Sequence, residues 1–296
     1  MGQAAQYLIP VELELGGKDP MIVFEDVNLE RAVKGAAWGA FTNSGQSCTS
    51  VERLYVQNTI YDKFKNRLVE ETKKMKLGVD TDGDADMGAM ISDKQVTIIA
   101  DLVKDAVNNG AKMLTGVEWD FKNKMIPPII LEGTTHAMRI NQEEIFGPVL
   151  PLMKFNDEAE AIRLANDSNF GLSASVWSKD KERALRVSRK LTTGNISINN
   201  VMVSEGNHDL PFGGVKESGI GRYKGVHGLR SFCNMKSVLV DADSSKIEAN
   251  WYPYTKKKYS LFFGLIQSLF SGGMKKWTGL VLYGLPLEGE AKKERK

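Results

Sequence analysis

Short apolar segments alternate with amphipathic helical segments through most of the chain, and this alternation constrains the fold more than any other feature. Strand-like segments occupy residues 149–155, 172–177 and 194–199, and apolar residues recur at helical spacing in residues 158–166 and 181–190. Strands joined by helices of this length need crossover connections, so neighbouring strands run parallel. The sequence therefore predicts an α/β fold, with a doubly wound, mainly parallel sheet and helices on both of its faces.

The first half of the chain repeats this pattern. Strands are predicted at residues 11–15, 21–24, 51–56, 111–115 and 125–131, and helices at 29–40, 60–75 and 92–109. Asp26 or Asn28 caps the first of these helices. Pro127 and Pro128 place the last strand at a sheet edge or give it a bulge, because proline has no N–H for the ladder.

A polar, glycine-containing loop at residues 43–47 ends at Cys48. A cysteine reacts as its thiolate, and main-chain N–H groups near it favour that form and can hold a developing oxyanion. We therefore expect the loop amides to assist Cys48. A lone cysteine is more often a buried and inert small residue, so this interpretation depends on the surrounding sequence.

Glu14 lies at the end of the alternating strand 11–15, directly before Gly16 and Gly17. Glycine allows close approach of the backbone, so a carboxylate beside such a turn is well placed for a site. The alternative is a solvated strand face, which suits Glu12.

Two turn-rich stretches complete the candidate set. Residues 141–148 present paired carboxylates, an aromatic residue and a Gly-Pro stop. Residues 211–222 are dense in glycine, but the third glycine of a dinucleotide-binding fingerprint is replaced by Lys224. We interpret the second stretch as a loop that packs over a site.

Four segments together resemble successive motifs of the NAD(P)-dependent aldehyde dehydrogenases. They occur in the order and at the kind of spacing found in that family, and the resemblance covers about residues 8–240. One such match is weak evidence, whereas four in order are highly specific. The segments are VELELGGKDP (11–20), FTNSGQSC (41–48), EEIFGP (143–148) and PFGGVKESGIGR (211–222).

The resemblance implies catalytic roles for Cys48 and Glu14. Cys48 would attack the aldehyde carbonyl to give a thiohemiacetal, and loss of hydride to the nicotinamide would leave a thioester. Glu14 would be the general base that activates water for hydrolysis of the thioester. Family members that transfer the acyl group to coenzyme A do not need this carboxylate, so Glu14 favours a carboxylic acid product.

The resemblance also implies a cofactor site for NAD or NADP. Glu144 would bind the hydroxyls of the nicotinamide ribose, Phe146 would pack against the nicotinamide, and Leu15 and Gly16 would lie beside the cofactor.

Asn199, Phe212 and the loop 201–210 would line the passage for a small-molecule aldehyde. Phe146 and Phe212 are alternatively ordinary core aromatics.

Family members are much longer, and the resemblance implies that the missing part is N-terminal and holds most of the cofactor domain. We expect a remnant of its last strand at 1–14, the catalytic domain at 15–217, a helix and an oligomerisation strand at 218–250, and a tail at 251–296. The chain is then a fragment, one part of a split enzyme that pairs with an N-terminal half, or a stand-alone remnant. The same oligomerisation strand makes a homo-oligomer the other expected assembly.

The expected function is oxidation of an aldehyde to a carboxylic acid within a longer or complemented enzyme. One alternative is a non-catalytic module that forms oligomers. Another is a weak thiol esterase, in which Cys48 and Glu14 hydrolyse an activated ester without a cofactor.

Composition excludes several other classes. The net charge of +2 combines a basic tail, nine Lys and Arg against three Glu from Thr255 onward, with a mildly acidic body of 30 basic and 34 acidic residues, so no nucleic-acid groove is indicated. His136, His208 and His227 are scattered and form no metal site. Two cysteines and an N-terminus without a signal-peptide pattern predict a cytoplasmic location.

Residues 259–274 of the tail carry no charge and lie between basic clusters at 256–258 and 275–276. The segment is shorter than the roughly 20 residues of a membrane-spanning helix. It predicts an amphipathic tail helix, which either contacts a membrane surface through residues 259–287 or packs on the enzyme body or another subunit. Its apolar stripe is Leu261, Phe262, Leu265, Ile266, Leu269 and Phe270, with Ser260, Gly264, Gln267 and Ser268 opposite.

Overall fold

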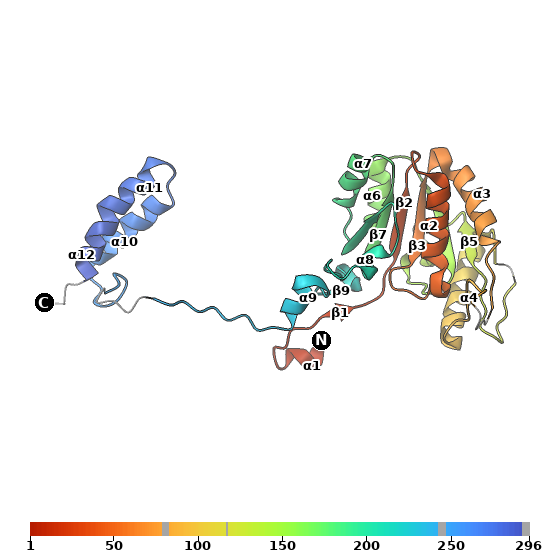
Figure 1. The fold of residues 1–296 in the computed structure, drawn as a ribbon, viewed down its shortest axis with the longest axis horizontal. Coiled ribbons are helices and arrows are strands. Elements are labelled where there is room, and N and C mark those ends of the chain that lie inside the picture. Colours follow the sequence, from red (N-terminus) through yellow and green to blue (C-terminus); the bar gives the residue numbers. More distant parts are fainter. Residues whose placement is uncertain (79–82, 117, 242–246, 292–296) are drawn as a thin grey trace. The chain divides into compact units, whose positions relative to one another are not determined.

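The computed structural model describes residues 1–78, 83–116, 118–241 and 247–291. The chain divides into two compact units, residues 1–234 and 235–296 (Figure 1). The single division falls inside the segment 218–250 that the sequence assigns to one region. The helix of that segment therefore belongs to the first unit and the residues after Asn234 to the second.

The first unit is built on a seven-stranded sheet with the strand order β4-β5-β6-β3-β2-β7-β8. All pairs are parallel except the edge pair of β4 with β5, which confirms the predicted α/β fold. The strands are β2 (Asp19–Val23), β3 (Val51–Gln57), β4 (Lys112–Met113), β5 (Ile129–Glu132), β6 (Val149–Phe155), β7 (Ser173–Trp177) and β8 (Asn195–Ile198).

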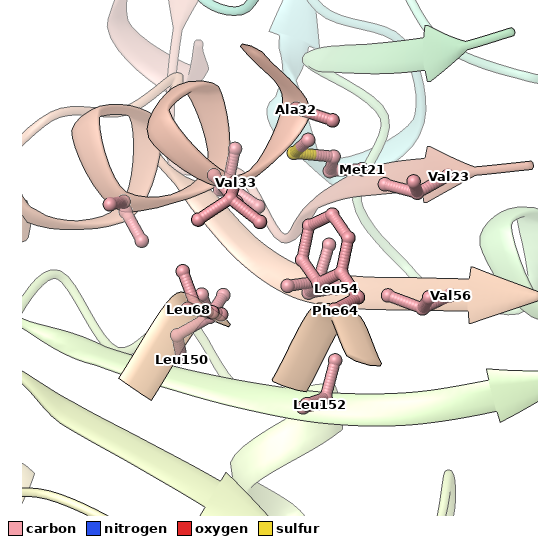
Figure 2. Packing of buried hydrophobic residues seen from close by; sticks show 14 of the residues in the cluster. Met21, Val23, Ala32, Val33, Leu54, Val56, Phe64, Leu68, Leu150 and Leu152 are labelled. Carbon is pink, nitrogen blue, oxygen red and sulfur yellow. The ribbon is translucent and has the colours of Figure 1, made fainter. Parts of the chain in front are cut away.

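Helices cover both faces of this sheet because its central strands are apolar on both sides. In β2, Met21 and Val23 pack on one side with α2 (Leu29–Phe41) and α3 (Tyr61–Thr72), as Figure 2 shows. Ile22 points to the other side, toward α6 (Glu158–Asn166) and α7 (Lys181–Ser188). A third cluster joins α4 (Asp93–Asn108) to β5.

Side-chain caps fix the starts of these helices. The Asn28 side chain accepts the main-chain N–H of Arg31, which confirms one of the two predicted caps of α2. Ser92, Asp157 and Asp180 cap α4, α6 and α7 in the same way.

Shorter elements connect the layers and carry the candidate site. A separate two-stranded antiparallel sheet pairs β1 (Leu13–Glu14) with β9 (Gly219–Ile220). The remaining short helices are α1 (Gly2–Ala5), η1 (Thr42–Gly45), η2 (Asn58–Ile60), α5 (Arg139–Gln142), α8 (Val203–Gly206), η3 (Lys216–Ser218) and α9 (Gly225–Ser231).

Two predicted strands differ from the structure for identifiable reasons. The strand 11–15 shortens to two residues because its partner, β9, is itself only two residues long. Pro127 and Pro128 precede β5 rather than interrupt it, and the ladder begins with the N–H of Ile129, which donates to the carbonyl of Pro148.

The second unit contains a helical hairpin rather than the single tail helix that the sequence predicts (Figure 1). The chain reverses after α10 (Lys256–Leu269), where Gly273 has the positive φ of +67° that glycine tolerates. It returns as α11 (Met274–Gly279), a π-helical turn η4 (Leu280–Gly284) and α12 (Leu285–Ala291). The predicted oligomerisation strand, residues 234–240, has no regular structure, and Leu239 is 94% exposed.

We expect Phe64→Ala to lower the free energy of unfolding of the first unit by about 3–5 kcal/mol, because Phe64 is fully buried between α3 and the sheet. Urea denaturation followed by circular dichroism measures this loss. Phe121→Ala is the matched control, since Phe121 is 59% exposed and its loss should cost less than about 1 kcal/mol. Equal losses in the two variants would contradict this description of the core.

Candidate active site

Cys48 lies on the loop between η1 and the amino end of β3. Asn43, Ser44 and Gly45 all have positive φ there, so the chain turns sharply after α2. A β-carbon on Gly45 would collide with the carbonyl of Gly147, which shows that the loop packs directly on the segment following Glu144.

The turn at Gly16 and Gly17 brings two predicted site residues together. The N–H of Gly17 donates to Oε1 of Glu144 over 3.1 Å, and a β-carbon on Gly17 would collide with the carbonyl of Cys48. A β-carbon on Gly16 would collide with the carboxylate of Glu144. Three segments that are distant in the sequence therefore meet at this turn.

The pairing of β1 with β9 holds Glu14 just before the turn at Gly16 and Gly17. Glu14 lies opposite Gly219, and the N–H of Leu15 donates to the carbonyl of Ser218 over 3.1 Å. Desolvation by neighbouring groups raises the pKa of the Glu14 carboxyl, against a main-chain hydrogen bond from Gly214 and the charge of Arg222. Because the side chain remains exposed, water limits this rise.

Burial raises the pKa of the Cys48 thiol to about 11, and the negative charges of Glu205, Glu14 and Asp19 add to the effect. The sequence predicts that loop amides favour the thiolate, and a main-chain hydrogen bond does lower this pKa, but burial and the neighbouring carboxylates outweigh it. The charge of Glu14 acts on the thiol, so the two predicted catalytic groups share one environment. A base must therefore remove the thiol proton at neutral pH.

Glu205 of α8 is a site residue that sequence reasoning missed. Its Oε2 accepts the hydroxyl of Thr49, the residue after Cys48, over 2.7 Å. Lys224 donates to the carbonyl of Glu205, and its ammonium lies 5.1 Å from the ring centroid of Phe212 and 5.3 Å from that of Tyr223. The only sequence signal was the expectation that the loop 201–210 approaches the site.

A buried ion pair supports the segment that carries Glu144 and Phe146. Lys18 Nζ lies 2.8 Å from Oε2 of Glu52, and both side chains are almost fully buried. Glu52 also accepts the N–H groups of Ile145 and Phe146, each over 2.9 Å. Phe146 has a φ of +47°, so these bonds hold a strained backbone in place. Burial raises the pKa of the Glu144 carboxyl.

The structure does not bring Asn199 to Cys48. The amide of Asn199 bonds the N–H and the carbonyl of Ser178 over 3.0 and 2.9 Å, beyond the carboxyl end of β7, whereas Cys48 precedes the amino end of β3. Its side chain is therefore used to join β7 and β8.

Phe212 is fully buried rather than exposed to a passage. It packs edge-on against Tyr223, with 5.4 Å between ring centroids. The charges of Glu14 and Glu205 add to burial in raising the pKa of the Tyr223 hydroxyl, so this hydroxyl lies near the predicted site residues. Phe212 therefore supports the site from behind Tyr223.

The family model described as "Aldehyde dehydrogenase family" matches residues 1–238. This chain belongs to the aldehyde dehydrogenase family. A 4,4′-diapolycopene aldehyde oxidase of Methylomonas is 45% identical over 270 residues, which cover 91% of this chain and 50% of that protein. The mouse 4-trimethylaminobutyraldehyde dehydrogenase is 41% identical over 248 residues, 81% of this chain and 50% of that protein.

A solved aldehyde dehydrogenase structure shares the fold. The betaine aldehyde dehydrogenase of Staphylococcus aureus in complex with NAD⁺ is 38% identical, with a TM-score of 0.77 over 86% of this chain and 51% of that chain. This chain thus spans about half the length of the relatives it matches.

The family resemblance assigns the nicotinamide ribose of NAD or NADP to the residues at the glycine turn, and these residues fit it. A ribose diol needs a carboxylate that can accept hydrogen bonds, and Glu144 presents one against a bare stretch of backbone at Gly16. Leu15, which is 48% exposed, lies next to it as an apolar surface.

We expect alkylation of Cys48 by iodoacetamide to rise about tenfold per pH unit between about pH 7 and 9, because the thiolate fraction rises that way below a pKa of about 11. Glu205→Gln removes a negative charge beside the thiol, lowers its pKa and should speed alkylation at pH 8 about fivefold. Mass spectrometry in a Cys233→Ser background measures the rate.

Glu182→Gln on the exposed side of α7 is the matched control and should leave the rate unchanged. A wild-type rate that already levels off near neutral pH would contradict the raised thiol pKa.

Proposed function

We propose that this chain provides the catalytic part of an enzyme that oxidises an aldehyde to a carboxylic acid with NAD or NADP. The observation that carries the proposal is the meeting of Cys48, Glu14 and Glu144 around one glycine turn. The relatives support it, since they include an NADP-dependent succinate-semialdehyde dehydrogenase of Escherichia coli and the NAD⁺-bound betaine enzyme.

In this mechanism the Sγ of Cys48 forms a bond to the carbonyl carbon as its proton passes to a base. The main-chain N–H of Cys48 donates to the oxygen that gains charge. The cofactor, when bound, supplies a hydride acceptor, and the acyl group then remains on sulfur as a thioester. Glu14 takes a proton from water, the hydroxide attacks the thioester carbon, and the acid leaves as the sulfur regains its proton.

The raised pKa of Glu14 suits this second step. A general base works best when its pKa lies near the working pH, and partial desolvation moves a carboxyl in that direction. The raised pKa of Cys48 gives Glu14 or a water beside it the further task of accepting the thiol proton.

We further propose that the chain needs a second protein segment for full activity, either as part of a longer chain or from a separate N-terminal half, and that the assembled enzyme is a cytoplasmic homo-oligomer. The family resemblance assigns the adenosine and pyrophosphate contacts, and one oxyanion donor, to the half of the relatives that this chain does not match. Loss of one such donor raises a barrier by about 3 kcal/mol.

Esterase activity is a second candidate, because the thiol and the base both lie within this chain. An activated ester acylates sulfur without hydride transfer, so hydrolysis of p-nitrophenyl acetate tests the pair in the absence of cofactor.

With p-nitrophenyl acetate and the purified chain, we expect Glu14→Gln to release about one equivalent of nitrophenol and then to turn over at least about a hundredfold more slowly than the wild type, because hydrolysis of the thioester lacks its base. Cys48→Ala should give no burst. Mass spectrometry should find the acetyl group on Cys48 and not on Cys233.

The control is Glu12→Gln, a change on the same segment but outside the site. If Glu14→Gln and Glu12→Gln hydrolyse the ester at the wild-type rate, Glu14 is not the base.

Calorimetric titration of the 296-residue chain with NAD should show binding several decades weaker than that of a complete relative, since each loss of about 1.4 kcal/mol is a factor of ten in the dissociation constant. Adding the N-terminal half of a relative in trans should strengthen binding. A micromolar dissociation constant for the chain alone would refute the need for a second segment.

A further inference from the structure

The hairpin of the second unit is packed through small residues. A β-carbon on Gly264 of α10 would lie 2.6 Å from the ring of Tyr283, and one on Gly279 would collide with Ser268. The ion pair of Lys257 with Glu290, 2.8 Å long, closes the open end. The sequence pattern places Gly264 and Ser268 opposite the apolar stripe of a single helix, and the structure places both in the seam between the helices.

Large apolar side chains point away from this seam. On α10 these side chains recur four, three and four residues apart. On the returning helices α11, η4 and α12 they recur three, four and four residues apart, so each arm of the hairpin carries one stripe. The hairpin buries Leu287 and half-buries Leu265, as a hairpin stable in water does, but such a hairpin does not usually leave a second set of large apolar residues exposed. The two stripes, all exposed, are Tyr259, Phe263, Ile266 and Phe270, and Met274, Trp277, Val281 and Leu285.

Small residues in the seam and apolar residues outside are the pattern of helices that pack in lipid. The hairpin does not span a bilayer: α10 has 14 residues, about 21 Å at 1.5 Å per residue, against about 30 Å of hydrocarbon. No helix of the described residues is long and apolar enough to cross one.

The charges suit a lipid surface with negative head groups. The described residues 255–291 contain five Lys and two Glu. Lys256 lies at the open end of the hairpin, and Lys275 and Lys276 lie just after its turn, while residues 259–274 between them carry no charge. Cations at both ends oppose deep insertion of the turn and favour a hairpin that lies flat in the head-group layer.

The match to one relative reaches into the tail. The family match ends at residue 238, whereas the match to the Methylomonas relative covers 91% of this chain and must extend into the tail. The mouse relative covers only 81%. The hairpin thus lies outside the part of the chain that the family model matches.

We propose that residues 256–291 dock this protein flat on an anionic lipid bilayer, with the two apolar stripes in the acyl boundary and the lysines on the phosphates. The proposal concerns attachment alone and does not depend on the oxidation of aldehydes.

Flotation of the full chain with vesicles tests this. We expect the wild type to float with vesicles of 30% phosphatidylserine in phosphatidylcholine, and Phe263→Ser/Phe270→Ser to bind at least about tenfold more weakly through lost apolar burial. Lys275→Gln/Lys276→Gln should bind the anionic vesicles about tenfold more weakly than the wild type, and should bind vesicles of pure phosphatidylcholine as the wild type does. Neither pair lies in the seam, and circular dichroism checks that the hairpin stays folded.

The control for the phenylalanine pair is Phe121→Ser, a change at an exposed phenylalanine of the first unit, which should float as the wild type does. A wild type that stays unbound, or a Phe121→Ser loss as large as that of the pair, overturns the proposal. The proposal is also overturned if the wild type does not bind vesicles but forms an oligomer, and Phe263→Ser/Phe270→Ser dissociates that oligomer. A second copy of the chain would then cover the stripes.

Fluorescence locates the contact. Lipids brominated near the head group should quench Trp277 more than lipids brominated deep in the chain, and Trp277→Phe should remove this quenching. Trp38→Phe, at an exposed tryptophan of the first unit, should leave it intact. Quenching that survives Trp277→Phe, or that is greatest from deep positions, contradicts flat docking by the hairpin.

Discussion

Bare backbone at Gly16 and Gly17 is the constraint on which the candidate site depends. The strand leaving Glu14, the loop carrying Cys48 and the segment carrying Glu144 approach so closely there that no β-carbon fits. A hydrogen bond across the turn runs from the N–H of Gly17 to Glu144. A side chain at Gly16 would collide with the Glu144 carboxylate and one at Gly17 with the main-chain carbonyl of Cys48, so a substitution at either position displaces a predicted site residue.

Buried charge gives this arrangement its rigidity. Removing Lys18 and Glu52 from water costs several kcal/mol for each ion, and their attraction offsets this only when the remaining polar atoms are also paired. Glu52 meets that condition by accepting the N–H groups of Ile145 and Phe146. The ion pair thus holds the backbone directly after Glu144 in one conformation. An interaction that stabilises the fold therefore also positions Glu144.

Local pattern predicts what is local in this molecule. The strand Val149–Phe155 and the helix Glu158–Asn166 follow the sequence prediction residue for residue, since periodicity and an Asp157 cap define them. Glu14, Cys48 and Glu144 stand in motifs, so the sequence predicts them as site residues. Glu205 has no motif, and its bond to Thr49 joins residues 156 apart in the sequence, a pairing that only the fold creates. The tail shows the same limit: spacing places Gly264 opposite an apolar stripe but does not show which side of the helix faces a neighbour.

The electrostatics of Cys48 follow from the same geometry. The turn that brings Glu14 close, and the Thr49 hydroxyl that holds Glu205 close, surround the thiol with negative charge in a half-buried loop. A thiol held protonated is a poor target for oxidation and alkylation, so the arrangement protects the sulfur until a proton acceptor is in place. An ordinary carboxylate accepts that proton poorly, because its pKa lies far below that of the thiol. Desolvation raises the pKa of Glu14 and so reduces the difference between the two pKa values. Desolvation thus raises the pKa of both groups, which disfavours the thiolate and favours proton uptake by the Glu14 carboxylate, and the mechanism that we propose depends on the two groups being within reach of each other.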